Sequence, residues 1–215
     1  MSGTVKRAGP FRLVATLGVA GFASGLILVS VFLVTQPLIL RNEAEALERA
    51  IYKVVPGSES RKIFIPEGEK LVPFQETGGR IPTENAVYGA YDKAGNLLGY
   101  GIPSDGPGFQ DTIKLIYGYD PVKKRIIGME ILDSRETPGL GDKIFKDENF
   151  VNNFKDLAIE PEVVAVKPGN KSAPNEVDTI SGATISSKAV IKIINEGNSR
   201  WIKLLDTIES EGPHE

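Results

Sequence analysis

The 215-residue chain contains no cysteine and only one histidine. Without cysteine it cannot form disulfides, thiolate nucleophiles, iron–sulfur clusters or Cys-ligated zinc sites. The histidine, His214, is the next-to-last residue of a polar tail, so neither a Ser-His-Asp triad nor a His-ligated haem is expected. We therefore predict no catalytic residue and no metal ligand in this chain, and any redox or transfer chemistry has to come from a bound group.

The charged residues are distributed unevenly. Three of the 25 basic residues lie in residues 1–40, which contain no acid, so residues 41–215 have 22 bases against 28 acids and a net charge of −6. Domains that bind nucleic acid usually carry a positive surface. We predict that nucleic acid is not a partner.

An uncharged run of 22 residues, Leu13 to Val34, is rich in Leu, Val, Ile, Ala, Phe and Gly. As a helix with a rise of about 1.5 Å per residue it is roughly 33 Å long, enough to cross the hydrocarbon core of a bilayer. A cleaved signal peptide is the alternative, but its apolar core spans about 7–15 residues and a small-x-small cleavage site follows it. Here Thr35-Gln36-Pro37-Leu38 follows a longer run. We predict a retained transmembrane helix over residues 13–34.

Residues 1–12 contain Lys6, Arg7 and Arg12 and no acid, whereas both signs of charge are mixed after the apolar run. The positive-inside rule therefore places the N-terminus in the cytoplasm and the C-terminal part on the outer, periplasmic side of the inner membrane. Within the run, Gly21-x-x-x-Gly25 is a spacing at which membrane helices pack closely. It predicts a helix partner in the membrane, although glycine is also common in membrane helices in general.

Residues 35–57 form a membrane-proximal segment, in which Asn42–Val55 has the apolar spacing of an amphipathic helix that Pro56-Gly57 ends. Residues 58–209 are expected to form one folded domain, and residues 210–215 a flexible tail. The first part of the domain, residues 63–82, is rich in Pro, Gly and Glu and is predicted to be extended chain or loop.

Two hairpins are predicted in the middle of the chain. Residues 86–91 and 97–102 flank a turn that contains Gly95, and residues 112–119 and 125–133 flank a turn that contains Pro121. Together they predict a four-stranded antiparallel sheet. The segment between them, Pro103–Phe109, is rich in Gly and Pro and is predicted to be a loop.

Further elements follow the hairpins. Asp147–Leu157 is predicted to be a short helix and Glu162–Val166 a strand. Apolar residues recur on one stripe between Ser186 and Ile208, which predicts a long amphipathic helix packed on the sheet. Hairpins and helices that are separate, without βαβ alternation, indicate an α+β fold of antiparallel hairpins packed with helices.

The segment Asp178-Thr179-Ile180-Ser181-Gly182-Ala183-Thr184-Ile185-Ser186-Ser187 leads into this helix. A strand end, a glycine for a tight turn and a helix start present N–H groups that have no intrahelical acceptor. A phosphate bound there would also meet the positive end of the helix dipole, worth about 0.3–1 kcal/mol. The alternative is ordinary N-capping, because Ser and Thr are preferred at helix starts whether or not they bind a ligand.

Letter for letter, Asp-x-x-Ser-Gly-Ala-Thr at residues 178–184 resembles the flavinylation motif of the FMN-binding domain family. In that family FMN is joined to the final threonine through a phosphoester, so the resemblance implies that Thr184 carries the flavin. It also implies cofactor-binding positions at the residues around the attachment point, which are Ser181, Gly182, Ala183, Ile185 and Ser186. A covalent FMN cannot diffuse away outside the cytoplasm.

The segment Ser134-Arg135-Glu136-Thr137-Pro138-Gly139-Leu140-Gly141 carries a second resemblance. It is similar to the loop that lies against the flavin in the exterior flavoprotein subunits of Rnf and Na⁺-translocating NADH:quinone reductase complexes. The resemblance implies that Gly139 and Leu140 lie at the isoalloxazine, and that Glu136 and Thr137 either hydrogen-bond its polar edge or position other donors. The alternative, a proline-nucleated turn, accounts for Pro138 and Gly139 only.

Two more positions are carried over from the resemblance. Lys167-Pro168-Gly169 is similar to a Lys-Gly-Gly stretch of the family, which implies a flavin contact for Lys167, with a solvated surface lysine as the alternative. Phe109 lies where relatives often have Trp or His near the flavin. It is therefore either an aromatic residue in contact with the flavin ring or a core residue.

The resemblance covers the chain in order, and in length and architecture it is greatest to the G subunit of Rnf complexes, with the C subunit of the quinone reductase second. It implies an electron-transfer subunit of a membrane-bound, ion-translocating oxidoreductase complex, linked to ferredoxin or NADH, that carries covalent FMN and is not catalytic alone. The implied partners are other integral-membrane and peripheral subunits, one of them also flavinylated, and a Mg-dependent flavin transferase that uses FAD. Two alternatives stay open: a membrane-tethered flavoprotein of another extracytoplasmic reductase or regulator, and a flavin-free scaffold subunit.

Overall fold

Alternating apolar side chains build the central sheet. In β5 (Thr112–Asp120), Ile113, Leu115 and Tyr117 pack into one core cluster and Ile116 into another, and all four are buried. Because successive side chains point to opposite faces of a strand, this pattern requires that both faces of the sheet are covered. The structure is a computed structural model, which describes residues 9–75, 82 and 85–211, the last four as backbone only.

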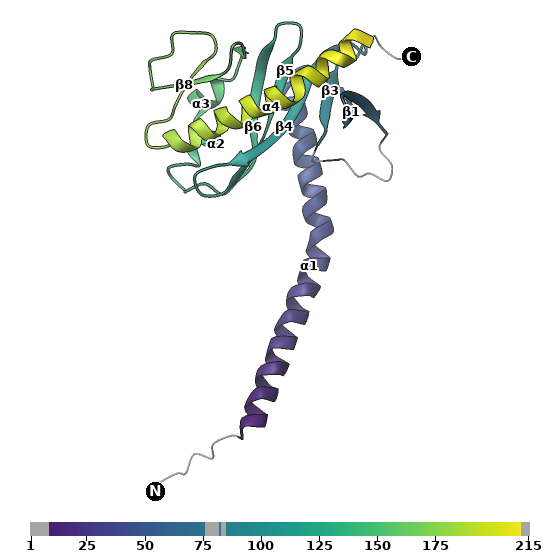
Figure 1. Cartoon of the computed structure of the whole chain (residues 1–215), viewed down its shortest axis with the longest axis vertical. Helices are drawn as coiled ribbons and strands as arrows, with labels where there is room; N and C mark the ends of the chain where they lie inside the picture. The colour runs from purple at the N-terminus through teal and green to yellow at the C-terminus, as the bar shows by residue number, and fades with distance from the viewer. Residues whose placement is uncertain (1–8, 76–81, 83–84, 212–215) are drawn as a thin grey trace. The chain divides into compact units, whose positions relative to one another are not determined.

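The main sheet has seven antiparallel strands in the order β2-β1-β3-β4-β5-β6-β7 (Figure 1). The strands besides β5 are β1 (Ser60–Glu67), β2 (Lys70–Phe74), β3 (Val87–Tyr91), β4 (Leu97–Pro107), β6 (Arg125–Ser134) and β7 (Leu157–Ala158). A separate parallel pair consists of β8 (Val164–Val166) and β9 (Glu176–Asp178). The α+β class and both predicted hairpins are confirmed.

Helix α4 (Thr184–Glu211) covers one face of the sheet (Figure 1). Its buried stripe is the predicted one, although the side chain of Ile208 lies outside the described residues. The stripe residues that are buried against the strands are Val190, Ile193, Ile194, Trp201 and Leu205. Two short helices, α2 (Lys143–Lys146) and α3 (Glu148–Asn152), follow β6. The helix predicted over residues 147–157 is only partly confirmed, because α3 ends at Asn152 and Leu157 begins β7.

The opposite face is covered by the last turns of α1 (Pro10–Val54). Leu47, Ala50, Ile51 and Val54 of this helix are buried together with residues of β1, β3 and β5. The amphipathic spacing predicted for Asn42–Val55 therefore has a structural basis, since its apolar face is part of the domain core.

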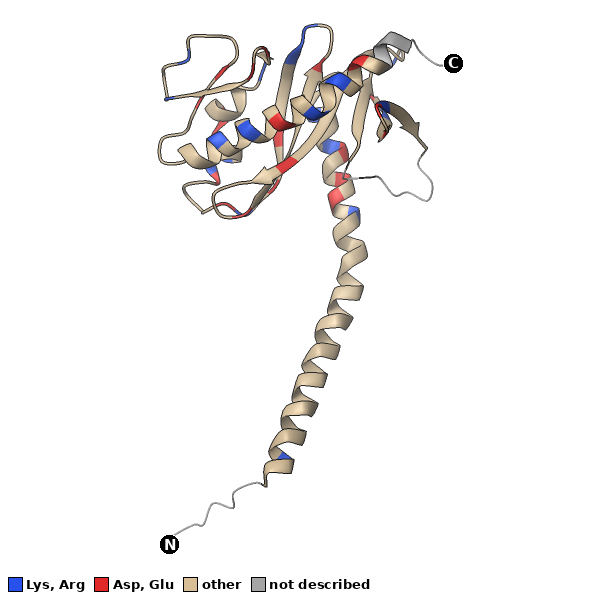
Figure 2. Ribbon diagram, in the orientation of Figure 1, with Lys and Arg blue, Asp and Glu red and all other residues tan. Residues whose placement is uncertain are grey.

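The N-terminal part of α1, up to Glu43, belongs to a compact unit of its own. Among the described residues, α1 is the one helix that is long and apolar enough to cross a membrane by its length and composition. Figure 2 shows no charged residue in it between Arg12 and Arg41. The hydroxyls of Thr16 and Ser30 donate to backbone carbonyls of the preceding turn, both at 2.7 Å. Their polar groups are thus satisfied within the helix, as a hydrocarbon environment requires.

One local prediction is wrong: Pro103–Phe109 is not a loop, because β4 continues to Pro107. Beyond Gly101 the recorded pairs of β4 are with β5 alone, and a strand with one free edge accepts proline. Of residues 63–82, predicted as extended chain or loop, the first part forms most of the β1–β2 hairpin, which turns at Gly68. Helix α1 runs through Pro37 without a break, and proline is tolerated in membrane-type helices.

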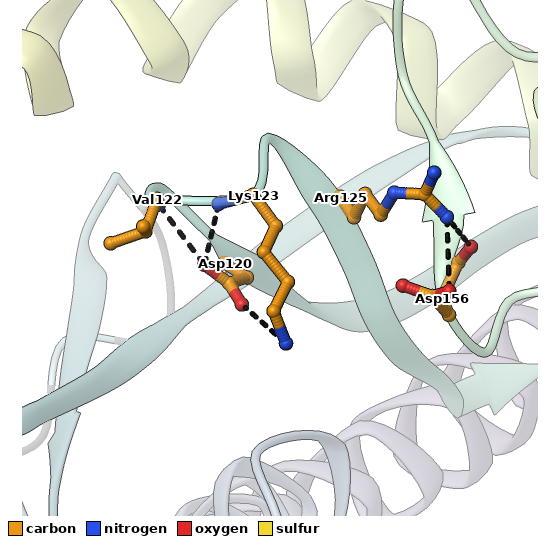
Figure 3. Close-up of polar contacts among 5 residues, drawn as sticks. All are labelled: Asp120, Val122, Lys123, Arg125 and Asp156. Atoms are coloured by element: carbon orange, nitrogen blue, oxygen red, sulfur yellow. Dashed lines mark hydrogen bonds and ion pairs between the residues drawn. The ribbon is translucent and has the colours of Figure 1, made fainter.

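Polar contacts fix the start of β6 (Figure 3). The Oδ1 atom of Asp120 accepts hydrogen bonds from the backbone N–H groups of Val122, at 3.0 Å, and Lys123, at 2.9 Å. The Arg125 guanidinium donates to both the carbonyl and the carboxylate of Asp156, at 2.9 Å each. These contacts hold the turn before β6 and the segment before β7, while the other end of β6 leads into the candidate site.

Candidate functional site

The turn that precedes α4 is held by its own residues. The Ser187 hydroxyl accepts a hydrogen bond from the Ile180 N–H at 3.1 Å and donates one to the Ala183 carbonyl at 2.9 Å. Gly182 has a φ angle of 82°, in the left-handed region that glycine adopts without steric cost. These contacts place Thr184 as the first residue of the helix.

The first turn of α4 presents backbone donors. The Ser187 N–H bonds to the Ala183 carbonyl at 2.9 Å, as the first hydrogen bond of the helix. Helix geometry therefore leaves the N–H groups of Thr184, Ile185 and Ser186 without an intrahelical acceptor. Such a helix start suits an anion, and its dipole favours negative charge.

The Thr184 side chain is accessible. Thr184 is exposed, and its hydroxyl makes a long contact of 3.5 Å with the Ile180 carbonyl. Ser181, Gly182 and Ile185 are exposed as well, whereas Ala183 is buried beneath the turn. The hydroxyl predicted to carry the cofactor is therefore open to modification.

A buried carboxylate joins the two predicted motifs. Glu136 is only 5% exposed, and its Oε1 accepts the backbone N–H groups of Phe109, at 2.8 Å, and Gln110, at 3.0 Å. Its Oε2 accepts the hydroxyl of buried Ser186 at 2.6 Å. The neighbouring Thr137 hydroxyl donates to the Gln110 side-chain carbonyl at 3.1 Å. These contacts suit one of the two roles implied for Glu136, the positioning of other donors.

The loop after Glu136 packs closely on the start of α4. A Cβ atom at Gly141 would lie 2.5 Å from the Glu136 carboxylate and 2.9 Å from the Ser186 hydroxyl oxygen, so only glycine fits there. The Leu140 side chain lies beside Gly182, 3.8 Å from where a Cβ of that glycine would stand. This close approach accounts for the second glycine of the motif, which a simple turn does not require.

Three apolar side chains of these joined segments face solvent. The exposed fraction is 63% for Phe109, 50% for Leu140 and 59% for Ile185. The interpretation of Phe109 as a core residue is therefore wrong. Large apolar side chains exposed beside polar groups are compatible with a surface that binds a ligand or a partner.

A cleft of about 710 Å³ adjoins the turn before α4. Lys143, Lys146 and Asn153 line it, together with Asp178 and Ser181. Its volume falls in the range of about 300–1,000 Å³ typical of small-molecule sites.

Polar groups of the cleft are only partly satisfied. Among the described residues, the Asp178 Oδ1 atom is buried without a hydrogen-bond partner, and such an acceptor calls for a donor. The Lys146 ammonium lies 2.6 Å from Asp142 and is the main cause of the lowered pKa of that carboxyl group. The cleft thus offers an open acceptor, and its charged lining contains Lys143 and Lys146 as well as Asp147 and Asp178.

The segment of Lys167 also reaches the cleft. The Val166 carbonyl accepts hydrogen bonds from both the N–H and the hydroxyl of Thr179, each at 2.9 Å, which ties the end of β8 to the turn. Pro168 and Gly169 line the cleft, while the Lys167 side chain is exposed.

Some residues of this region have no local signal in the sequence. Gln110, Lys143 and Lys146 reach the region only because loops far apart in the chain fold together. Asp178 differs from them, because it opens the Asp-x-x-Ser-Gly-Ala-Thr motif and its position there is a usable signal.

A known protein family matches the part of the chain that contains this site. Residues 108–198 match the family model described as FMN-binding domain, and this range contains every predicted site residue. The chain is 35% identical over 154 residues to the G subunit of the Na(+)-translocating ferredoxin:NAD(+) oxidoreductase complex of Acetobacterium woodii, and the match covers 70% of this chain and 68% of that protein.

Two further comparisons extend over more of the chain. It is 27% identical over 186 residues to the G subunit of the proton-translocating ferredoxin:NAD(+) oxidoreductase complex of Clostridium ljungdahlii, with 86% of this chain and 88% of that protein covered. Among solved structures, Shewanella oneidensis NqrC is similar with a TM-score of 0.62 and 17% identity, covering 78% of this chain and 100% of that one. At this identity the structural likeness concerns the fold alone.

Proposed function

Because this chain belongs to the family of the G subunits of ion-translocating oxidoreductase complexes, we propose that it is the electron-transfer subunit of such a complex and carries FMN covalently on Thr184. One observation carries the attachment: the last threonine of the Asp-x-x-Ser-Gly-Ala-Thr motif is exposed at the first position of α4. A threonine that only stabilised the helix start would not need the rest of this motif.

The residues present fit FMN. The first-turn N–H groups of α4 and the helix dipole suit its phosphate. Leu140, Ile185 and Phe109 offer exposed apolar surface for a planar ring system. The Asp178 Oδ1 atom, which has no hydrogen-bond partner within the described part of the chain, offers an acceptor for a ring N–H group. Lys143 and Lys146 supply positive charge beside the same turn.

The attachment uses Thr184 as a nucleophile. Its Oγ1 forms a new bond to the FMN phosphorus of FAD while the phosphoanhydride bond of FAD breaks, AMP leaves, and the flavin transferase takes the hydroxyl proton. The resulting phosphodiester keeps one negative charge, which the N-terminal end of α4 stabilises. The reaction needs a hydroxyl that the transferase can reach, and the Thr184 side chain is exposed.

When bound, FMN supplies the electron-transfer chemistry, and the protein supplies attachment, orientation and a surrounding that tunes its potential. Since the chain has no cysteine and its lone histidine is His214, the centres that give and accept the electrons belong to other subunits. These partners are integral-membrane and peripheral subunits, including a second flavinylated one. We place the N-terminus in the cytoplasm and the FMN domain, residues 58–209, outside it.

The test is to express the full chain with a flavin transferase and to examine the denatured protein for flavin fluorescence and added mass. Wild type and Ser199→Ala are expected to retain one FMN, because Ser199 is an exposed α4 serine outside the motif. Thr184→Ala is expected to lose it completely. Release of all flavin from the wild type on denaturation would contradict covalent attachment.

A further inference from the structure

Glu136 links segments that are far apart in the sequence. Its acceptor contacts reach 26 and 27 residues back, to Gln110 and Phe109, and 50 residues forward, to Ser186. The carboxylate is buried, and the hydroxyl that it accepts is buried too, at 3% exposure for Ser186. Leaving a buried hydrogen-bonding group without its partner is costly, so the three contacts favour a single arrangement of these segments.

This arrangement surrounds the attachment point. Ser186 is two residues beyond Thr184 in the first turn of α4, so its hydrogen bond fixes the rotation of that turn. Phe109, on the second segment, presents an exposed aromatic ring, and Gly141, on the third, packs directly on the carboxylate. We infer that Glu136 is a positioning residue for the flavin: it holds Thr184, the Phe109 segment and the Leu140 loop in the relative positions that the attached flavin requires. This inference rests on the proposed function.

The chain contains a matched control for this role. Glu176 accepts the same kinds of donor, the backbone N–H groups of Ser172, at 2.6 Å, and Ala173, at 3.0 Å, and the Ser172 hydroxyl, at 3.1 Å. All of these donors lie within four residues of Glu176, so these contacts of its carboxylate close a local loop. Replacing each Glu by Gln removes one acceptor oxygen at nearly constant size. At Glu136 both oxygens accept hydrogen bonds, so a contact is lost. At Glu176 the Oε2 atom accepts all three, so the amide oxygen of Gln keeps them, and this variant controls for the substitution itself.

The experiment compares full-length wild type, Glu136→Gln, Ser186→Ala and Glu176→Gln. Hydrogen–deuterium exchange on the flavin-free proteins reports whether two sets of N–H groups loosen together: those of residues 109–110, which bond to Glu136, and those from Ser187 onward, which are the first hydrogen-bonded N–H groups of α4. The visible circular dichroism and the midpoint potential of the attached flavin then report its orientation and surroundings. Ser186→Ala removes a single contact, so it keeps the test valid even where Glu136→Gln folds poorly.

For Glu136→Gln and Ser186→Ala we expect exchange about tenfold faster in both segments, a changed flavin dichroism and a shifted potential, with the flavin still covalent. Glu176→Gln is expected to leave exchange in both site segments and the flavin signals at wild-type values. Flavin signals that match wild type in both site variants would overturn the inference. A different result would contradict the proposed function: a wild-type chain that acquires no covalent flavin at all.

Discussion

At the scale of single residues, Tyr117 links burial to pH dependence. Its side chain is fully buried on the face of the sheet that α4 covers, and a Cβ atom at Gly197 of α4 would lie 2.7 Å from its hydroxyl. Burial raises the pKa of this phenol above the usual value of 10.0 and outweighs the opposing effect of the Ser104 hydroxyl. The folded state therefore holds Tyr117 in its neutral form.

This raised pKa predicts a specific loss of stability in alkali. Below about pH 9 the phenol is protonated in both folded and unfolded chains, and the free energy of unfolding does not depend on it. As the pH rises above 10, only the unfolded chain ionises, so stability falls by up to about 1.4 kcal/mol per pH unit for this group. Tyr117→Phe is expected to reduce that fall while changing stability at pH 7 by less than about 1.5 kcal/mol.

Urea unfolding at pH 7 and at several values above pH 10 measures the effect. Tyr52→Phe is the control, because the Tyr52 side chain is only half-buried. An alkaline loss that is the same in wild type and Tyr117→Phe would show that Tyr117 is not its source.

At the scale of elements, glycines let the end of α1 approach the sheet. Gly101, Gly118 and Gly128 are direct cross-strand partners on β4, β5 and β6. A Cβ atom at Gly118 would lie 2.2 Å from the Val54 carbonyl oxygen, and one at Gly101 would lie 3.5 Å from Ile51. The last turn of α1 can lie on the strands because this row has no side chains.

For Gly118 and Gly128, which are partners in this row, we expect opposite outcomes of the same substitution. Gly118→Ala places a methyl group against backbone, which must move, and overpacking of this kind costs about 1–3 kcal/mol or more. Gly128→Ala meets its nearest atom, the Val54 carbonyl oxygen, at 3.7 Å, an ordinary contact, and is expected to be neutral or slightly stabilising because alanine loses less chain entropy on folding. Thermal unfolding of both full-length variants in detergent measures the difference, and equal shifts would mean that α1 does not pack at Gly118.

Local chemistry explains which elements the sequence predicts. The two hairpins are predictable because each turn is encoded by adjacent residues, such as Asp92 and Gly95. The β1–β2 hairpin is not, because its Pro and Gly content is typical of loops and its position depends on pairing with β3, more than 20 residues away in the sequence. Likewise, Pro103 and Pro107 are compatible with β4 only because this part of the strand pairs on one side, a tertiary property.

The same distinction holds for the candidate site. The exposed Thr184 at a helix start is predictable from a contiguous motif, and so is the tight turn at Gly182. The hydrogen bond between Glu136 and Ser186 is not, because 50 residues separate the partners and neither residue type demands the other. The cleft that adjoins Ser181 is equally a product of α2 and α3 folding back on the turn.

At the scale of the whole molecule, the chain divides at Glu43, within a single helix. The part before this point is apolar and exposed, and the part after it supplies Leu47, Ile51 and Val54 to the domain core. The residues at the start of the chain carry Lys6, Arg7 and Arg12 without an acid, whereas the C-terminal part is net acidic. This asymmetry is the basis for placing the two ends on opposite sides of the membrane.

The absence of native cysteine makes this topology directly measurable. Ser2→Cys and Ser199→Cys each introduce one thiol with little change in size, and Ser199 is exposed on α4. A membrane-impermeant maleimide added to intact cells is expected to label the Ser199→Cys protein at once, and the Ser2→Cys protein only after lysis, because the basic N-terminal segment stays inside. Wild type is the zero-label control. Labelling of Ser2→Cys but not Ser199→Cys in intact cells would reverse the orientation and with it the placing of the flavin, since Thr184 and Ser199 lie on the same helix and therefore on the same side.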